Sequence, residues 1–199
     1  MEEEGLKKIP DLRIAQWKFE LQSIDRVKND AGMKEKILTE IKTHKMAPLY
    51  QLYAKDLNWT VDKSLLDSMK EENAKTLKEL EEAIKDAEEN LGESELREAL
   101  LKKAEFYAVI GDKKAALEAV RKTNEKTVGL GNRMDLVFLQ IRIGLFFMDH
   151  EIIKNNIEKA KEMLEEGGDW DRRNRLKVCF DKYLVLNIIN NHLLQKHLF

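Results

Sequence analysis

Within residues 62–91, a set of mostly apolar side chains recurs at steps of three or four among charged residues. This spacing constrains the fold more than any other feature of the sequence. Such steps place side chains on one face of an α-helix. The stripe consists of Leu66, Met69, Asn73, Leu77, Leu80, Ile84, Ala87 and Leu91. A coiled coil is the weaker interpretation, because barely four heptads include an asparagine and an alanine. We predict one long amphipathic helix, capped by Thr60 or Asp62 and ended by Gly92.

Shorter helices are predicted before this stripe. Pro10 and Asp11 suit a helix start and precede apolar residues that continue to Leu21. Residues 29–32 are typical of a turn, and a second helix with helically spaced apolar residues follows them. Pro48 fits the first turn of a third helix.

Helical hairpins are predicted after residue 92, where Ser94 is expected to cap the next helix. Gly111 and Asp112 separate two helices whose small residues allow close approach, which is the logic of tetratricopeptide (TPR) repeats. A second unit runs from 136 to 164, with an offset of 40 residues rather than the usual ~34. The repeats are therefore TPR-like and degenerate. Their expected helix contacts are Ala104, Tyr107, Ala116, Val120, Gly144 and Phe147.

A third unit is predicted to begin at the joint formed by Gly167, Gly168 and Asp169. One of the two glycines is expected to adopt a left-handed conformation, while Asp169 caps the following helix. Trp170 is expected to pack between repeats. The charged cluster of Asp169, Asp171, Arg172, Arg173 and Arg175 indicates helix capping and ion pairing between repeats rather than anion binding.

Composition argues against several classes of function. The 199 residues include 35 basic and 37 acidic side chains, so the basic excess of a nucleic-acid-binding surface is missing. Cys179 is the single cysteine and has no partner for an internal disulfide, which suits a reducing compartment. The acidic start lacks the pattern of a signal peptide, and apolar residues never run for 18 positions, so we expect no membrane span.

No catalytic, cofactor-binding or metal-binding residues are predicted, and no small-molecule substrate is expected. The four histidines (His44, His150, His192 and His197) lack metal-ligand spacing, and Cys179 lacks a base nearby in the sequence. The acids of residues 79–89 alternate with lysines, which indicates a solvated helix face. Residues 128–133 contain two glycines but no phosphate-loop pattern, and are expected to form a turn between repeats. The chain is therefore predicted not to be an enzyme.

Several runs of the sequence resemble one protein family. The most specific run is Glu165-Glu166-Gly167-Gly168-Asp169-Trp170-Asp171-Arg172-Arg173-Asn174-Arg175-Leu176-Lys177-Val178. Others are Pro10-Asp11-Leu12-Arg13-Ile14-Ala15-Gln16, Met46-Ala47-Pro48-Leu49-Tyr50, Asn90-Leu91-Gly92-Glu93-Ser94-Glu95 and Arg142-Ile143-Gly144-Leu145-Phe146-Phe147-Met148-Asp149. Together they make residues 1–178 similar to the N-terminal half of the non-ATPase regulatory subunit 6 family of the 26S proteasome.

This resemblance implies a non-catalytic scaffold of the lid in the regulatory particle, which supports ubiquitin-dependent protein degradation in the cytoplasm and nucleus. Its implied partners are other lid and base subunits. A related subunit of the COP9 signalosome has the same architecture but lacks the run at 167–175, so the proteasomal interpretation is favoured. A free-standing TPR-like adaptor that binds peptides in a groove is the alternative from another class.

The expected fold is all-α and forms an α-solenoid. Residues 1–92 form an N-terminal helical region with the long charged helix, and residues 93–178 form the TPR-like repeats. The resemblance stops after Val178, and the PCI domain that follows in the family is absent. Residues 179–199 are therefore predicted to be a divergent, foreign tail that forms a poorly packed helix, as in a truncated product.

Overall fold

The computed structural model describes residues 8–24 and 30–196, with side-chain burial given up to residue 185. Every regular element in these residues is an α-helix, which confirms the all-α prediction. The helices are α1 (Leu12–Ser23), α2 (Ala31–Thr43), α3 (Ala47–Asp56), α4 (Lys63–Asn90), α5 (Glu93–Ile110), α6 (Lys113–Glu125), α7 (Leu130–Phe147), α8 (His150–Gly167) and α9 (Trp170–Lys196).

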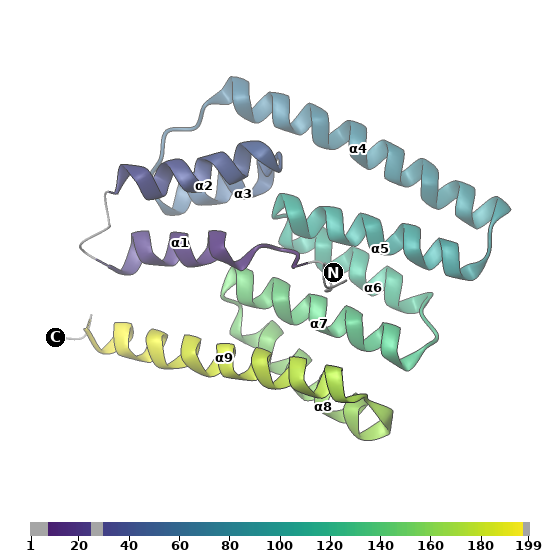
Figure 1. Ribbon diagram of the computed structural model, residues 1–199. Helices are drawn as coiled ribbons and strands as arrows, with labels where there is room; N and C mark the ends of the chain where they lie inside the picture. Colours follow the sequence, from purple (N-terminus) through teal and green to yellow (C-terminus); the bar gives the residue numbers. More distant parts are fainter. Residues whose placement is uncertain (1–7, 25–29, 197–199) are drawn as a thin grey trace, which may run out of the picture.

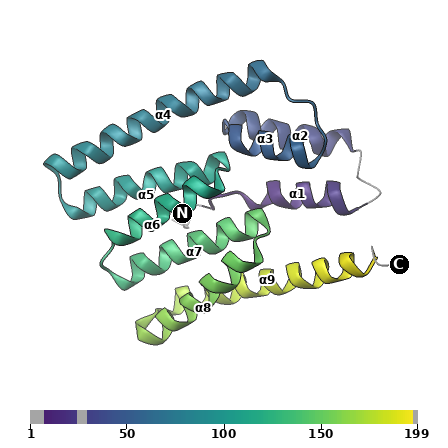
Figure 2. The ribbon, with the colours of Figure 1, turned by 180° about the vertical axis from the view of Figure 1, so that it is seen from behind.

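The helices stack in a layered arrangement (Figures 1 and 2). Helix α4 crosses one end of the stack, the hairpins α5–α6 and α7–α8 follow, and α9 lies at the other end. Helix α1 lies beside α7, although more than 100 residues separate them in sequence. Helix α4 packs on α5 across the boundary predicted at residue 92. The arrangement is that of a helical solenoid, while the closer likeness to TPR repeats and the domain boundaries stay predictions.

Aspartate side chains set most of the helix starts. Each carboxylate accepts a hydrogen bond from a backbone N–H group in the first turn, where helical partners are lacking. The capping residues are Asp11, Asp30, Asp62, Asp112, Asp149 and Asp169. The carboxylate of Asp62 accepts from the N–H of Leu65 at 3.1 Å, so Asp62 rather than Thr60 caps the long helix.

Three helices begin at residues that differ from the predicted ones. Helix α5 begins at Glu93 after an extended Gly92, so Ser94 lies inside the first turn and is not the cap. Two glutamates in that turn favour the early start, because they interact with the positive helix end. Helix α7 begins at Leu130, so the turn predicted over 128–133 is shorter. Helix α2 begins at Ala31, while residue 29 lies outside the described residues.

The predicted stripe of α4 faces the rest of the protein only in part. Leu66, Met69 and Ala87 are buried, and so is Asn73, whose Nδ2 donates to the carbonyl oxygen of Lys45 at 2.9 Å. That hydrogen bond satisfies a polar group in an otherwise apolar contact. The middle of the stripe is half-buried and Leu91 is exposed. The long amphipathic helix is therefore confirmed, with its firmest packing near its two ends.

The predicted contacts within the hairpins are confirmed. Ala104, Ala116 and Val120 are fully buried in one apolar cluster, against which Tyr107 and Phe147 pack. At Gly144 the helices α7 and α8 approach so closely that an added Cβ would lie 2.8 Å from Cγ1 of Ile153. Small residues therefore set the separation of the paired helices, as their spacing in the sequence indicates.

The turn between α5 and α6 requires a glycine. Gly111 has a φ of 78°, in the left-handed region that L side chains rarely adopt. An added Cβ would also lie 2.6 Å from Cβ of Leu49 in α3. The α5–α6 turn therefore packs directly against α3, and this close contact is possible because residue 111 has no side chain.

The joint before α9 follows the prediction except at Trp170. Gly167 has a φ of 155° and Asp169 caps α9, with the N–H of Arg172 donating to its carboxylate at 2.8 Å. Trp170, however, is 78% exposed, so the predicted packing between repeats is wrong. Helix α9 contacts its neighbours through Leu176, and at about 100° per residue Trp170 lies on a different face.

The predicted tail continues α9 without a break through Lys196. Phe180 and Tyr183 pack against the cluster of α7 and α8, while Leu184 and Val185 are exposed. Residues 197–199 and the side chains after residue 185 lie outside the description, so the packing and the foreign origin of the tail stay predictions. None of the described helices has the length and apolar content needed to cross a bilayer.

Candidate functional site

The residues considered for chemistry lie on separate elements. His44 follows α2 and its Nε2 lies 3.4 Å from a carboxylate oxygen of Glu40. His150 begins α8, and its ring centroid lies 5.9 Å from that of Tyr183. The side chain of His192 and all of His197 lie outside the description. Within the described part of the chain, no group of three or more histidines, cysteines and acids is arranged to hold a metal ion.

The acidic run of α4 forms a solvated face, as predicted. Lys78 lies 3.9 Å from Glu82, and Lys85 lies 3.8 Å from Glu89, on the exposed side of the helix. One acid reaches a neighbouring helix: Glu81 accepts a hydrogen bond from Nζ of Lys103 in α5 at 2.7 Å. The run therefore ties α4 to α5 and does not gather acids around one point.

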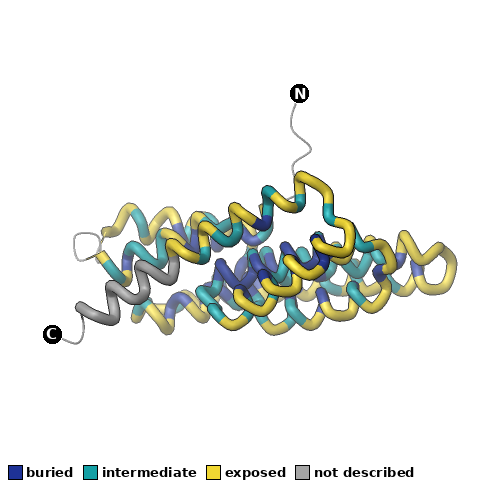
Figure 3. The backbone as a smooth tube through the Cα atoms, turned by 90° about the horizontal axis from the view of Figure 1, so that it is seen from below, coloured by how far each residue is buried: buried dark blue, intermediate teal, exposed yellow. Residues whose placement is uncertain are grey.

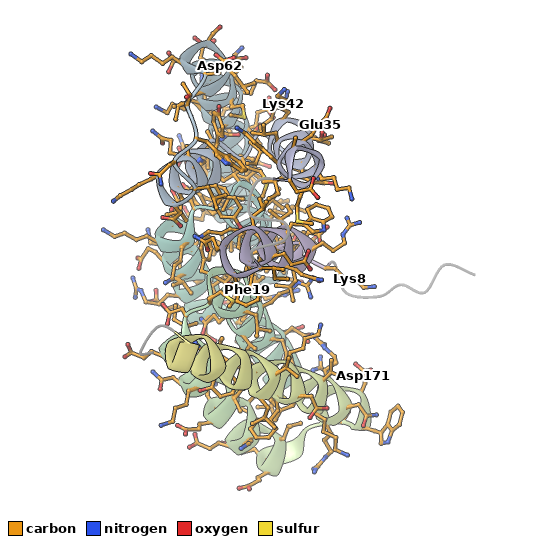
Figure 4. The ribbon with its side chains drawn as sticks, turned by 90° about the vertical axis from the view of Figure 1, so that its left-hand side faces the viewer. Lys8, Phe19, Glu35, Lys42, Asp62 and Asp171 are labelled. Carbon is orange, nitrogen blue, oxygen red and sulfur yellow. The ribbon has the colours of Figure 1, made fainter. Side chains whose placement is uncertain are left out.

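The described residues form a groove of about 550 Å³. It lies between the segment before α1, helix α5, helix α7 and helix α9, and the arrangement of these elements can be followed in Figure 1. Figure 4 shows Lys8, at its N-terminal edge, on the same side of the stack as Asp171 of α9. Apolar side chains form much of its floor, among them Leu136, Leu139 and Val178. We call this feature the central groove.

Arg142 of α7 attaches the N-terminal segment to the groove. Its Nε donates to the carbonyl oxygen of Pro10 at 2.8 Å, and its Nη2 donates to that of Lys8 at 3.2 Å. Burial lowers the pKa of the Arg142 guanidinium, although the charge of Asp11 acts in the opposite direction. The guanidinium stays protonated at neutral pH, because its ordinary pKa lies so far above 7. One partly buried cation therefore fixes the start of α1 on α7.

Asp135 of α7 joins α9 to the hairpins. Its carboxylate accepts hydrogen bonds from Nη2 of Arg172 at 2.8 Å and from Nη1 of Arg175 at 3.0 Å. The guanidinium carbon of Arg175 also lies 4.3 Å from the ring centroid of Phe138. The interaction with Asp135 raises the pKa of Arg172. The charged cluster predicted around residue 169 therefore combines capping with ion pairing between helices, as its sequence indicates.

Cys179 lines the central groove but is poorly suited to act as a nucleophile. Burial raises the pKa of its thiol, and the positive charges of Lys182, Arg175 and Arg142 offset this only in part. The thiol is therefore protonated at neutral pH, and the thiolate is the reactive form of cysteine. The groove is suited to contact with another protein segment, because it combines an apolar floor with charged edges.

The role of Arg142 is not among the features that the sequence predicts. The only local signal is a cation at the centre of the apolar run Leu139-Gln140-Ile141-Arg142-Ile143-Gly144-Leu145. A charge in that position needs a partner when it is buried. The partners are backbone carbonyls about 130 residues away, which no sequence spacing reveals.

Comparisons with known proteins place the chain in one family. A family model described as 26S proteasome subunit RPN7 matches residues 62–180, more than half of the chain. A 26S proteasome non-ATPase regulatory subunit 6 from Dictyostelium discoideum is 49% identical over 88% of this chain. The protein of that name from Caenorhabditis elegans is 47% identical over 88% of the chain, and a homologue from Arabidopsis thaliana is 49% identical over 77%.

The chain spans less than half the length of these curated relatives, with 45%, 43% and 40% of each covered in the same order. The match covers their N-terminal part, as the resemblance in the sequence implies. The family match includes the hairpins, the whole Asp135–Arg172 contact and the first part of α9. On this evidence the chain belongs to the family of the 26S proteasome subunit RPN7.

Proposed function

We propose that this chain is a non-catalytic scaffold of the proteasome regulatory particle, in the lid, and supports ubiquitin-dependent protein degradation. The observation that carries the proposal is the family match over residues 62–180, together with relatives that are proteasome regulatory subunits. The partners are other subunits of the lid and base, in cytoplasm and nucleus. The chain spans less than half of the length of its relatives, so the proposed role concerns only the stack of helices described above, which we call the helical arm.

The geometry of the arm supports a role in protein contact. The stacked hairpins present the central groove, whose floor is apolar and whose edges carry Lys8, Arg97 and Lys182. Within the described residues none of these three cations forms an ion pair. Such a surface suits a protein segment that supplies apolar and acidic groups. The protonated state of Cys179 favours a binding role over covalent catalysis.

Affinity purification tests the proposal. The tagged chain, produced in eukaryotic cells, is expected to recover subunits of the lid, and of the base through them, as quantified by mass spectrometry. Lys182→Glu reverses a charge of the groove and is expected to lower recovery severalfold. Lys70→Glu makes the same change on the exposed face of α4 and is the matched control. Recovery equal to that of an unrelated helical-repeat protein would contradict the proposal.

A free-standing adaptor is the second candidate, and the central groove is the observation that favours it. Sedimentation of cell extract through a density gradient separates the two. A lid component is expected to migrate with assembled proteasome subunits, whereas an adaptor migrates as a small species. Recovery of COP9 signalosome subunits in place of proteasome subunits would assign the chain to that related assembly.

A further inference from the structure

A pocket lies where the N-terminal helices meet the hairpins. Its volume is about 460 Å³, and it is bordered by α1, α3, the start of α6 and the end of α7. Its apolar wall includes side chains that are at least partly exposed, namely Phe19, Leu52, Phe147 and Met148. The pocket shares no lining residue with the central groove. We call this feature the α1–α3 pocket.

Tyr53 lines the α1–α3 pocket and carries a buried hydroxyl that has no hydrogen-bond partner among the described residues. Buried positions gather in the interior of the stack (Figure 3), and Tyr53 is one of them, with 2% of its surface exposed. Burial, and after it the charge of Asp56, raises the pKa of the phenol, so the hydroxyl keeps its proton and can donate it. A buried hydroxyl without a partner costs free energy that a phenylalanine would not. The hydroxyl therefore indicates an acceptor that another molecule supplies.

The charges around the pocket favour a neutral acceptor. Nζ of Lys18 lies 2.5 Å from Oδ2 of Asp56, and Lys113 forms an ion pair with Asp149. Both cations are thus already neutralised, and a carboxylate bound at Tyr53 would meet the negative charge of Asp56. An amide carbonyl accepts from a hydroxyl without adding charge. The apolar wall suits an aliphatic or aromatic side chain next to that carbonyl.

We propose that the α1–α3 pocket binds a neutral peptide segment of a partner protein, which inserts one apolar side chain and whose backbone carbonyl accepts a hydrogen bond from Tyr53. Ligand sites range from about 300 to 1,000 Å³, so a pocket of this size suits one side chain with its flanking peptide groups. Lys18, whose Nζ lies 4.9 Å from the centroid of the Tyr53 ring, turns aside as the segment enters. This inference deepens the proposed function, on which it rests for the kind of partner.

NMR titration of the purified full chain with N-acetyl-L-leucinamide tests the pocket. This uncharged probe carries a leucine side chain between two amide carbonyls. It is expected to bind with a Kd of about 1–10 mM, as suits its size of about 12 non-hydrogen atoms. Resonances of Leu52, Tyr53 and Met148 are expected to shift. N-acetyl-L-leucine has the same side chain beside a carboxylate, and is expected to bind at least about threefold more weakly.

Two tyrosines of α3 provide a matched comparison. Tyr53→Phe removes a hydroxyl that has no internal partner, so it is expected to weaken probe binding about threefold to tenfold without lowering the midpoint of urea unfolding. Tyr50→Phe removes a hydroxyl that accepts from the N–H of Asp62 at 3.0 Å. This variant is expected to lower the unfolding midpoint and to leave probe binding unchanged. The two substitutions therefore separate a binding role of the hydroxyl from a structural one.

Affinity purification tests the partner. Leu52→Lys places a cation in the apolar wall at a side chain that is 37% exposed, and is expected to lower recovery of proteasome subunits severalfold. Val128→Lys is the matched control, because Val128 is 86% exposed in the loop before α7. Circular dichroism confirms that both variants retain their helices. A wild-type chain that recovers no proteasome subunit would contradict the proposed function, whereas the probe titration judges the pocket without any partner.

Four results would overturn the proposal. The first is the absence of saturable shifts at the pocket up to about 50 mM probe. The second is a Tyr53→Phe variant that binds the probe as tightly as the wild type, or that is destabilised as much as Tyr50→Phe. The third is equal recovery of proteasome subunits by Leu52→Lys and Val128→Lys. The fourth is tighter binding of N-acetyl-L-leucine than of its amide, which would contradict a neutral acceptor.

Discussion

The Nε–H of Arg142 donates a hydrogen bond to the carbonyl oxygen of Pro10 at 2.8 Å, across a sequence separation of 132 residues. We expect Arg142→Met to lower the free energy of unfolding by about 1–3 kcal/mol, since hydrogen bonds to charged groups contribute about that much. Urea unfolding measures this loss. Amide exchange should become faster in α1 than in α8, because the start of α1 loses its anchor. Arg142→Lys retains a cation and is expected to recover part of the protection; unchanged exchange in α1 would refute the anchoring role.

Gly144→Ala should destabilise the protein although alanine is the better helix former. The new Cβ would lie 2.8 Å from Cγ1 of Ile153 and 3.3 Å from its backbone nitrogen, so the hairpin must open. Overpacking of this kind costs about 1–3 kcal/mol. Asn132→Ala in the same helix is the control, because Asn132 is exposed and its replacement likewise introduces the better helix former without adding atoms to the hairpin contact. Equal unfolding midpoints for the two variants would show that α7 and α8 are not closely fitted.

Trp170→Ala is expected to change the free energy of unfolding by less than about 0.5 kcal/mol, because the ring is largely in solvent. Leu176→Ala in the same helix should cost about 2–5 kcal/mol, since Leu176 is buried against α7 and α8. Thermal or urea unfolding of both variants measures the contrast. A large loss for the tryptophan variant would mean that its ring packs on the protein after all.

The stability of the α7–α8 turn should depend on pH through Asp149. The hydrogen bond from Lys113, followed by that from the N–H of Ile152, holds the pKa of the Asp149 carboxyl below its usual 3.8. A carboxyl whose pKa is lowered by folding stabilises the protein above its unfolded pKa, and this contribution disappears as pH falls through the folded value. The stabilising effect is therefore complete above about pH 5 and is lost progressively as the pH falls below 3.8 toward the lower folded pKa.

Asp149→Asn isolates this charge, because asparagine caps a helix about as well as aspartate. The wild-type protein should be more stable than the variant by about 0.5–1 kcal/mol at pH 6, and the difference should shrink near pH 3. Urea unfolding at the two pH values measures it. In a Lys113→Met background the asparagine substitution should have little effect at either pH. A difference that is independent of pH would show that the carboxylate charge is not involved.

Local sequence determined the helices and most of their ends. Aspartates such as Asp62 and Asp112 begin helices through hydrogen bonds to backbone groups two or three residues away, so the signal and its effect are neighbours in the chain. Gly111 ends α5 because of its own backbone conformation. The spacing of Ala104, Ala116 and Val120 likewise predicts the tight hairpin, since helical periodicity fixes which residues share a face.

Only the tertiary structure decided how these helices meet. Trp170 and Leu176 are both apolar residues of α9, yet one is exposed and the other is buried, because the direction from which α7 and α8 approach selects the buried face. The bonds from Arg142 to the segment before α1, and the central groove that this segment borders, depend on residues brought together from opposite ends of the chain. Periodicity states which residues share a helix face, but the partner of that face is set by packing over the whole stack.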